Sequence, residues 1–250
     1  MNLWRLELLR LVRTRRLLAI FGVYVFFGLS GPLTARYLGA ILNRVGTTEG
    51  ARIELPPPVP ADGIAQFVSN AAQLGLLVVV LVASSALAFD ARREMAAFLR
   101  TRVDSIVSIV GPAFTLNAAA AVAGFVAGSL AAWYETAVLL GAPPAGRLLA
   151  GIGYGALFLV FAVAVVAAVA ASVRGVLGTA GIALAILLVL ALVGNIGALG
   201  RWLPTNLAGA MVALLRGGSP TDALPTAGMT VALTAALLWY AVTVGGRREL

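Results

Sequence analysis

Six apolar segments, each about as long as a membrane-spanning helix, divide the chain into alternating apolar and polar stretches. A helix needs about 20 consecutive apolar residues to cross the hydrocarbon of a bilayer. The six segments are residues 17–33, 64–89, 106–133, 148–173, 176–199 and 226–244. The sequence therefore predicts an all-α, polytopic membrane protein with six transmembrane helices, in which residues 1–250 form a single transmembrane domain.

The composition leaves no room for a soluble domain of any size. Hydrophobic residues make up 61% of the 250 positions and charged residues 11%, whereas a soluble domain carries about 25% charged residues. The formal net charge is +8, but the basic residues flank the apolar segments, which is typical of membrane topology and not of DNA binding. We therefore expect membrane lipid, and not nucleic acid, as the surroundings of this chain.

Three residue types that catalytic and metal sites commonly use are missing from the sequence. It contains no cysteine, no histidine and no lysine, so that all 18 basic residues are arginine. Without lysine there is no Walker-type ATP-binding loop and no Schiff-base site, and without cysteine and histidine the commonest metal ligands are absent. We expect no cofactor and no metal in this chain, and no covalent chemistry by its residues.

The first 16 residues combine arginines with a stripe of apolar side chains. In a helix, the residues at i, i+4, i+7 and i+8 share one face, and here these are Trp4, Leu8, Leu11 and Val12. This pattern predicts an amphipathic helix over residues 1–16 that lies on the membrane surface. A basic region before an apolar run also fits a signal peptide, but no A-x-A-like cleavage site follows it.

Residues 90–104 form a charged segment between the second and third apolar segments. Its charged residues are Asp90, Arg92, Arg93, Glu94, Arg100, Arg102 and Asp104. Since one charge at the bilayer centre costs about 2.5 kcal/mol or more, this segment must lie in water beside the membrane. As a helix it would place Met95, Phe98 and Leu99 on one face. That face suits a groove on another protein or a surface of anionic lipid, and the residues alone leave both interpretations open.

Proline and glycine mark the expected ends of several spans. Gly31-Pro32 predicts a kink or an end near the close of the first span. Residues 43–63 form the longest predicted loop, and residues 135–147 form a second, shorter one. Residues 200–225 are predicted to be extracytoplasmic or re-entrant, because their apolar part is too short to cross a bilayer.

The distribution of arginine predicts the orientation. With six spans both termini lie on one side, and that side, which includes residues 90–104, carries 12 of the arginines, against 6 on the other. The acidic residues divide evenly between the two sides. By the positive-inside rule the termini and residues 90–104 face the cytoplasm.

A few polar residues lie within or at the edge of the predicted spans and are candidates for a substrate path. They are Asn70, Gln73, Thr115, Asn117 and Asn195, together with Glu135 beside Trp133 and Tyr134. An amide in hydrocarbon needs a hydrogen-bond partner. These residues therefore either bond neighbouring helices or face a path, and the sequence does not decide between the two.

Two glycine pairs have the spacing that allows close helix contact. They are Gly124-x-x-x-Gly128 and Gly151-x-x-x-Gly155. Small residues at this spacing let helix backbones approach each other in a membrane. Glycine and alanine are frequent throughout this chain, so the signal is weak.

The order of these parts resembles the membrane subunit of ABC-2 type transporters. The matching parts are a basic amphipathic helix (Trp4 to Arg16), a proline near the end of the first span, Arg93-Glu94 after the second span and a long stretch before the last span. Family members often read Arg-Glu-x-Gly-Thr at the third of these parts, whereas here Met95-Ala96-Ala97 follows Glu94. The resemblance covers nearly the whole chain and rests on layout.

The resemblance implies a permease subunit, most simply of an exporter, in a bacterial cell membrane. Residues 90–104 would then be the coupling helix, which a separate ABC ATP-binding subunit receives, with ATP and Mg²⁺ bound on that partner. The coupling residues would be Arg92, Arg93, Glu94, Met95, Phe98, Leu99, Arg100 and Arg102. A second permease subunit, in a homodimer or a heterodimer, would complete the transport path.

Two other function classes stay open as alternatives. A membrane-embedded enzyme generally needs paired carboxylates, a histidine-containing metal site or an activated nucleophile, and no Asp or Glu lies in the middle of a predicted span. A passive channel or an assembly subunit is the second alternative. We expect that the chain is not an enzyme, and the cargo cannot be read from the sequence.

Overall fold

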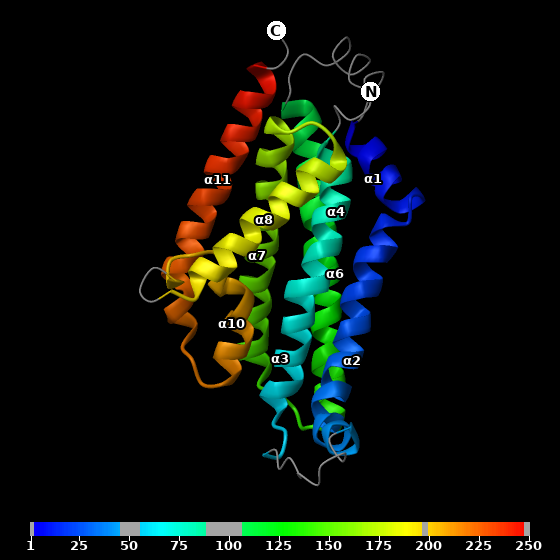
Figure 1. The fold of residues 1–250 in the computed structure, drawn as a ribbon, viewed down its shortest axis with the longest axis vertical. Coiled ribbons are helices and arrows are strands. Elements are labelled where there is room, and N and C mark those ends of the chain that lie inside the picture. Colours follow the sequence, from blue (N-terminus) through cyan, green and yellow to red (C-terminus); the bar gives the residue numbers. More distant parts are fainter. Residues whose placement is uncertain (1–2, 46–55, 89–106, 197–199, 248–250) are drawn as a thin grey trace.

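The chain folds into a bundle of long helices, shown in Figure 1. The computed structural model describes residues 3–45, 56–88, 107–196 and 200–247. Six helices within these ranges are long and apolar enough to cross a membrane. They cover Arg16–Leu42, Pro60–Leu87, Val107–Leu139, Ala145–Ser172, Val176–Gly194 and Pro220–Gly245. The predictions of an all-α fold and of a multi-pass membrane protein are confirmed.

Successive long helices run in opposite directions through the bundle (Figure 1). In chain order they are α1 (Leu3–Arg13), α2 (Arg16–Val45), α3 (Pro60–Asn70), the π-helical turn η1 (Ala71–Gly75), α4 (Leu76–Leu87), α6 (Val107–Leu139), α7 (Ala145–Ser172), α8 (Val176–Gly194), α10 (Asn206–Leu215), the 3₁₀ turn η3 (Pro220–Ala223) and α11 (Leu224–Arg247). Here α3, η1 and α4 form one continuous crossing.

Helix α2 runs through Pro32, where the sequence predicted a kink or an end. Gly31 and Pro32 are buried, and a Cβ at Gly31 would lie 2.9 Å from the Phe67 backbone nitrogen, so α3 packs directly on this turn. Beyond the proline, Arg36 Nη1 donates to the Leu139 carbonyl at the end of α6 (2.8 Å). Contacts with α3 and α6 therefore stabilise the part of α2 that the proline weakens.

Helix α7 lies at the centre of the bundle. Every residue of the stretch 161–169 is buried, and α7 packs against α4, α6, α8, α10 and α11. A helix that is apolar on all sides is expected at such a position. The other long helices leave one side exposed, where large apolar side chains would contact lipid.

The closest crossing joins α2 and α6 through glycines. A Cβ at Gly128 would lie 2.5 Å from the Tyr24 carbonyl oxygen, and a Cβ at Gly124 would lie 2.7 Å from Ile20 Cγ2. The second glycine pair also lies at contacts: a Cβ at Gly151 would lie 2.6 Å from Met211 Cα. Both sequence motifs therefore mark close helix approaches.

Helix α1 and the end of α11 lie at the same end of the bundle. Figure 1 shows α1, the end of α4, the beginning of α6 and the end of α11 at this end. The beginnings of α3 and α7 lie at the opposite end. An even number of crossings produces this arrangement, as the sequence predicted.

Candidate functional site

The fifth crossing is interrupted, and a partly open cavity lies at the interruption. Helix α8 ends at Gly194 and α10 begins at Asn206. Between them lies a cavity of about 260 Å³. It is lined by Ala72, Leu76, Phe158, Leu187, Ala191, Gly194, Asn195, Thr205, Asn206 and Ala208.

The interruption lies level with the middle of the bundle. Ala72 and Leu76 are close to the midpoint of the crossing Pro60–Leu87, and Phe158 is at the midpoint of α7. Figure 1 shows α8 running obliquely across the bundle, while α10 continues toward the opposite end. We expected residues 176–199 to cross completely as one helix. Helix α8 is long and apolar enough to cross a membrane, but it runs at a tilt (Figure 1), and α10 lies beside α3 and α7.

Three side chains, from the start of α10 and from α11, donate hydrogen bonds to backbone carbonyls at the interruption. Thr205 Oγ1 donates to the Leu190 carbonyl (3.3 Å), and the Asn206 amide donates to the Gly200 carbonyl. From α11, Thr226 Oγ1 donates to the Arg201 carbonyl (2.5 Å). Irregular backbone at membrane depth is tolerated only where such partners exist, and these bonds satisfy that condition.

A π-helical turn faces the interruption across the cavity. The turn η1 (Ala71–Gly75) inserts a wider loop of backbone between α3 and α4, and Ala72 lies in the cavity wall. On its other side the buried Tyr24 ring fits against Gly75, where a Cβ would lie 2.7 Å from Tyr24 Cε1. Single π turns inside α-helices are frequent at functional sites.

A larger, open cleft lies on the other side of α10. Its volume is about 740 Å³, and it is lined by side chains that include Arg201, Trp202, Ser219 and Asp222. Asn206 lines both the cleft and the cavity. Asn206, the first residue of α10, therefore lies between the cleft and the cavity.

Three of the six predicted path residues lie at or beside this site. Asn195 lines the cavity and donates its amide to the Ala191 carbonyl (2.9 Å). Asn70 and Gln73 flank the cavity residue Ala72 along the chain. Gln73 is exposed and donates to Ser69 Oγ at 3.4 Å.

The other three predicted path residues lie elsewhere. Thr115 is exposed near the beginning of α6, and Glu135 is half-buried near its end, about 30 Å further along the helix axis. Asn117 is buried and donates to the Ala113 carbonyl in its own helix (2.7 Å). These three residues do not form one path with the cavity.

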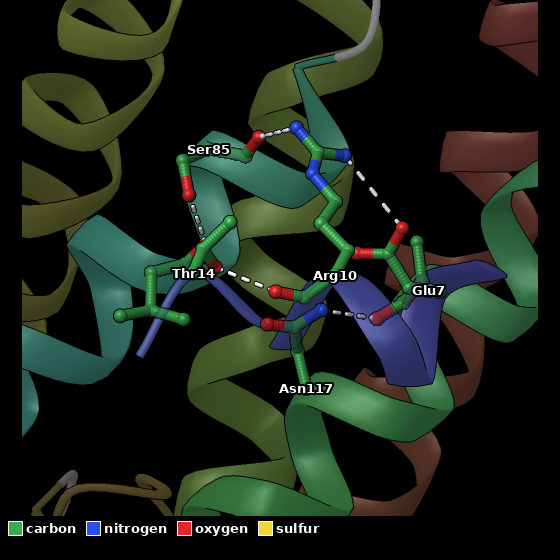
Figure 2. A network of polar contacts seen from close by, with 7 residues as sticks. Glu7, Arg10, Thr14, Ser85 and Asn117 are labelled. Atoms are coloured by element: carbon green, nitrogen blue, oxygen red, sulfur yellow. Dashed lines mark hydrogen bonds and ion pairs between the residues drawn. The ribbon is translucent and has the colours of Figure 1, made fainter. Parts of the chain in front are cut away.

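Asn117 belongs to a polar cluster beside α1, shown in Figure 2. From α1, Arg10 donates through Nη2 to the Ser85 carbonyl near the end of α4 (3.0 Å). Its Nη1 lies 3.6 Å from Glu7 Oε2. In Figure 2 the Asn117 side chain points from α6 toward α1. The Arg10–Ser85 hydrogen bond connects α1 to the end of α4. Ser85 precedes the charged segment 90–104 by only a few residues in the chain.

The predicted coupling residues lie outside the described residues. Arg92, Arg93, Glu94, Met95, Phe98, Leu99, Arg100 and Arg102 all fall within residues 89–106. Their role stays a prediction from the sequence.

Sequence reasoning did not identify Thr205, Asn206 or Thr226 as site residues. A signal was present, because Thr205 and Asn206 directly precede the apolar run 207–215, and such residues are typical of a helix start. Thr226 carried no comparable signal, since its partner carbonyl is 25 residues away in the chain. Within the described ranges no group of three or more Asp, Glu, His or Cys side chains is placed to hold a metal ion.

Comparison with known proteins found no family model, no curated protein and no solved structure that matches the chain.

Proposed function

We propose that this chain is the membrane-spanning permease subunit of an ATP-driven ABC transporter, an exporter of the ABC-2 type in a bacterial cell membrane. The observation that carries the proposal is the interrupted crossing between α8 and α10, with Asn195 and Asn206 at a cavity level with the middle of the bundle. Interrupted helices and polar side chains at this depth are typical of transport pathways.

The arrangement at the other end supports a mechanical connection to a partner. The charged segment joins α4 to α6, and Arg10 ties α1 to the Ser85 carbonyl near the end of α4. A force on residues 90–104 would therefore act on α1, α4 and α6 together. An ATP-binding subunit that received this segment could move the crossings that flank the cavity.

The exposed side of α8 supports contact with a second permease subunit. Leu188, Val189 and Leu192 are 62%, 57% and 62% exposed, and Gln73 is exposed near the same cavity. A second copy, or a related subunit, would cover this surface and turn an exposed cavity into an enclosed path. ATP and Mg²⁺ would stay on the ATP-binding partner, and no residue of this chain would perform covalent chemistry.

The proposal is tested by isolating the tagged chain from its native membranes in mild detergent. We expect an ATP-binding cassette protein to copurify in a fixed ratio, with ATPase activity in the complex. The double variant Arg93→Glu with Phe98→Asp should lose this partner and still insert, because it changes only the charged segment. Normal association of the double variant would disprove the coupling role.

The matched control is Arg147→Glu, a charge reversal at the opposite end of the bundle, where the side chain is exposed. This variant should keep the partner. Enzymatic turnover by the purified chain alone, with no nucleotide and no partner, would instead favour an embedded enzyme and overturn the proposal.

A further inference from the structure

A small void lies inside the bundle, among α2, η1, α6 and α7. Its volume is about 20 Å³, and about 10–15 Å³ is enough to hold one water molecule. The wall of the void includes Tyr24 of α2, Ala71 and Ala72 of η1, and Phe125 of α6. Tyr24 is the only lining residue that has a polar side chain.

The Tyr24 hydroxyl is a buried polar group that no other part of the described chain binds. The residue is 1% exposed, and its Oη has no hydrogen-bond partner within the described ranges. A Cβ at Gly75, the last residue of η1, would lie 3.2 Å from this oxygen. Ala71 lies one turn before Gly75 on the same side of the helix and lines the void. The hydroxyl therefore lies against the π-helical turn, beside the void.

The π-helical turn also leaves one backbone carbonyl without a helical partner. The Leu76 N–H donates to the Ala71 carbonyl, five residues back, and to the Gln73 carbonyl, three residues back. The turn ends there, and α4 continues with bonds between residues four apart, so that the α-helical bond of the Leu77 N–H is to Gln73. The return from π-helical to α-helical bonding therefore passes over the Ala72 carbonyl.

The void adjoins the cavity at the interruption. Ala72, Phe158 and Ala208 line both of them, and these three residues therefore form the wall between the two. Since the cavity is partly open, it is a source of water for the void.

We propose that this void is a binding site for one water molecule, held between the Tyr24 hydroxyl and the Ala72 carbonyl. The Tyr24 O–H donates to the water oxygen, and the water donates to the carbonyl. Buried waters typically bind polar groups that the fold leaves unpaired. The water thus connects α2 to the turn at which the second crossing changes its helical register.

The first test is a crystal structure of the full-length chain at a resolution that shows ordered water, with Tyr24→Phe beside the unmodified protein. We expect a peak of density about 2.7–3.0 Å from both Tyr24 Oη and the Ala72 carbonyl oxygen. Tyr24→Phe should lose this peak, because the water would keep only one partner. A void without density in the unmodified protein, or a Tyr24 hydroxyl bonded directly to a carbonyl, would overturn the inference.

Thermal unfolding in detergent gives a second, independent measurement. Tyr24→Phe should lower the unfolding temperature by about 2–4 °C, because it removes the partner of a bound water. Removing a hydroxyl that has no partner would raise this temperature instead. The matched control is Tyr134→Phe, at a residue that is 65% exposed, and it should leave the temperature unchanged.

A rise in the unfolding temperature of Tyr24→Phe, or an equal fall in the two variants, would overturn the inference. Since neither ATP nor a partner enters these measurements, their failure would not bear on the transporter proposal.

Discussion

At the scale of single residues, close helix contact in this bundle depends on the absence of a side chain. Gly28 of α2 faces Gly128 of α6, and a Cβ at Gly28 would clash with the Gly128 carbonyl oxygen and lie 3.0 Å from Ala131 Cβ. In lipid, helices are held by packing contacts, since burial between helices removes no apolar surface from water. The two glycines therefore set how closely α2 and α6 can pack.

We predict that Gly28→Ala destabilises the protein by about 1–3 kcal/mol, because the added methyl group forces the two backbones apart. The measurement is thermal unfolding of the purified protein in detergent. Gly22→Ala is the matched control in the same helix, since a Cβ there would meet no atom within 4 Å. That substitution should stabilise α2 by up to about 1 kcal/mol through helix propensity. Equal effects of the two substitutions would contradict this account of the crossing.

The sequence revealed part of this packing. Gly124 and Gly128 could be predicted as contact residues because their spacing places both on one face of a single helix. Gly28 could not, because its importance depends on which residue of α6 lies opposite, and that register follows from the tertiary packing. The same holds for Gly75, whose partner is the Tyr24 ring of a different crossing.

At the scale of elements, a side chain of α11 stabilises the connection between α8 and α10. The Arg201 carbonyl accepts the hydroxyl proton of Thr226, a buried residue near the beginning of α11. Four residues on, Thr230 is equally buried but donates to the Thr226 carbonyl of its own helix (2.7 Å). The two threonines are therefore both buried, but only Thr226 bonds a carbonyl outside its own helix.

We predict that Thr226→Val destabilises the protein by about 1–3 kcal/mol, because it leaves the Arg201 carbonyl without a partner. Thr230→Val should have a much smaller effect, since the carbonyl that it bonds already belongs to the helical ladder of α11. Thermal unfolding compares the two variants. Limited proteolysis should also show faster cleavage between α8 and α10 in Thr226→Val, and similar cleavage in both variants would refute the prediction.

The interruption itself could not be foreseen from apolar length. Residues 176–199 contain enough apolar side chains to cross a bilayer, and length does not reveal the tilt of a helix. Helix α8 packs against α4 and α7. For this reason the sequence placed Asn195 near the end of a complete span, whereas the structure places it at a cavity level with the middle of the bundle.

At the scale of the whole molecule, the six crossings were predictable because each needs only a long apolar stretch, and the bilayer fixes the required length. The path residues were predictable only in part. Asn117 was selected for its polarity within a span, but it bonds within α6 and faces α1. Composition identifies a polar group in an apolar segment, whereas only packing decides which neighbour it faces.

The distribution of arginine predicts how the molecule is oriented in the membrane. The side with α1 and the end of α11 is predicted to carry 12 of the arginines, and the opposite side carries half as many. Since arginine is retained on the cytoplasmic side during insertion, an epitope tag inserted between Pro57 and Pro58 should be accessible to antibody outside intact cells. A tag after Leu250 should become accessible only after permeabilisation. Accessibility of the C-terminal tag in intact cells would invert the topology and place residues 90–104 where no cytoplasmic ATP-binding subunit could reach them.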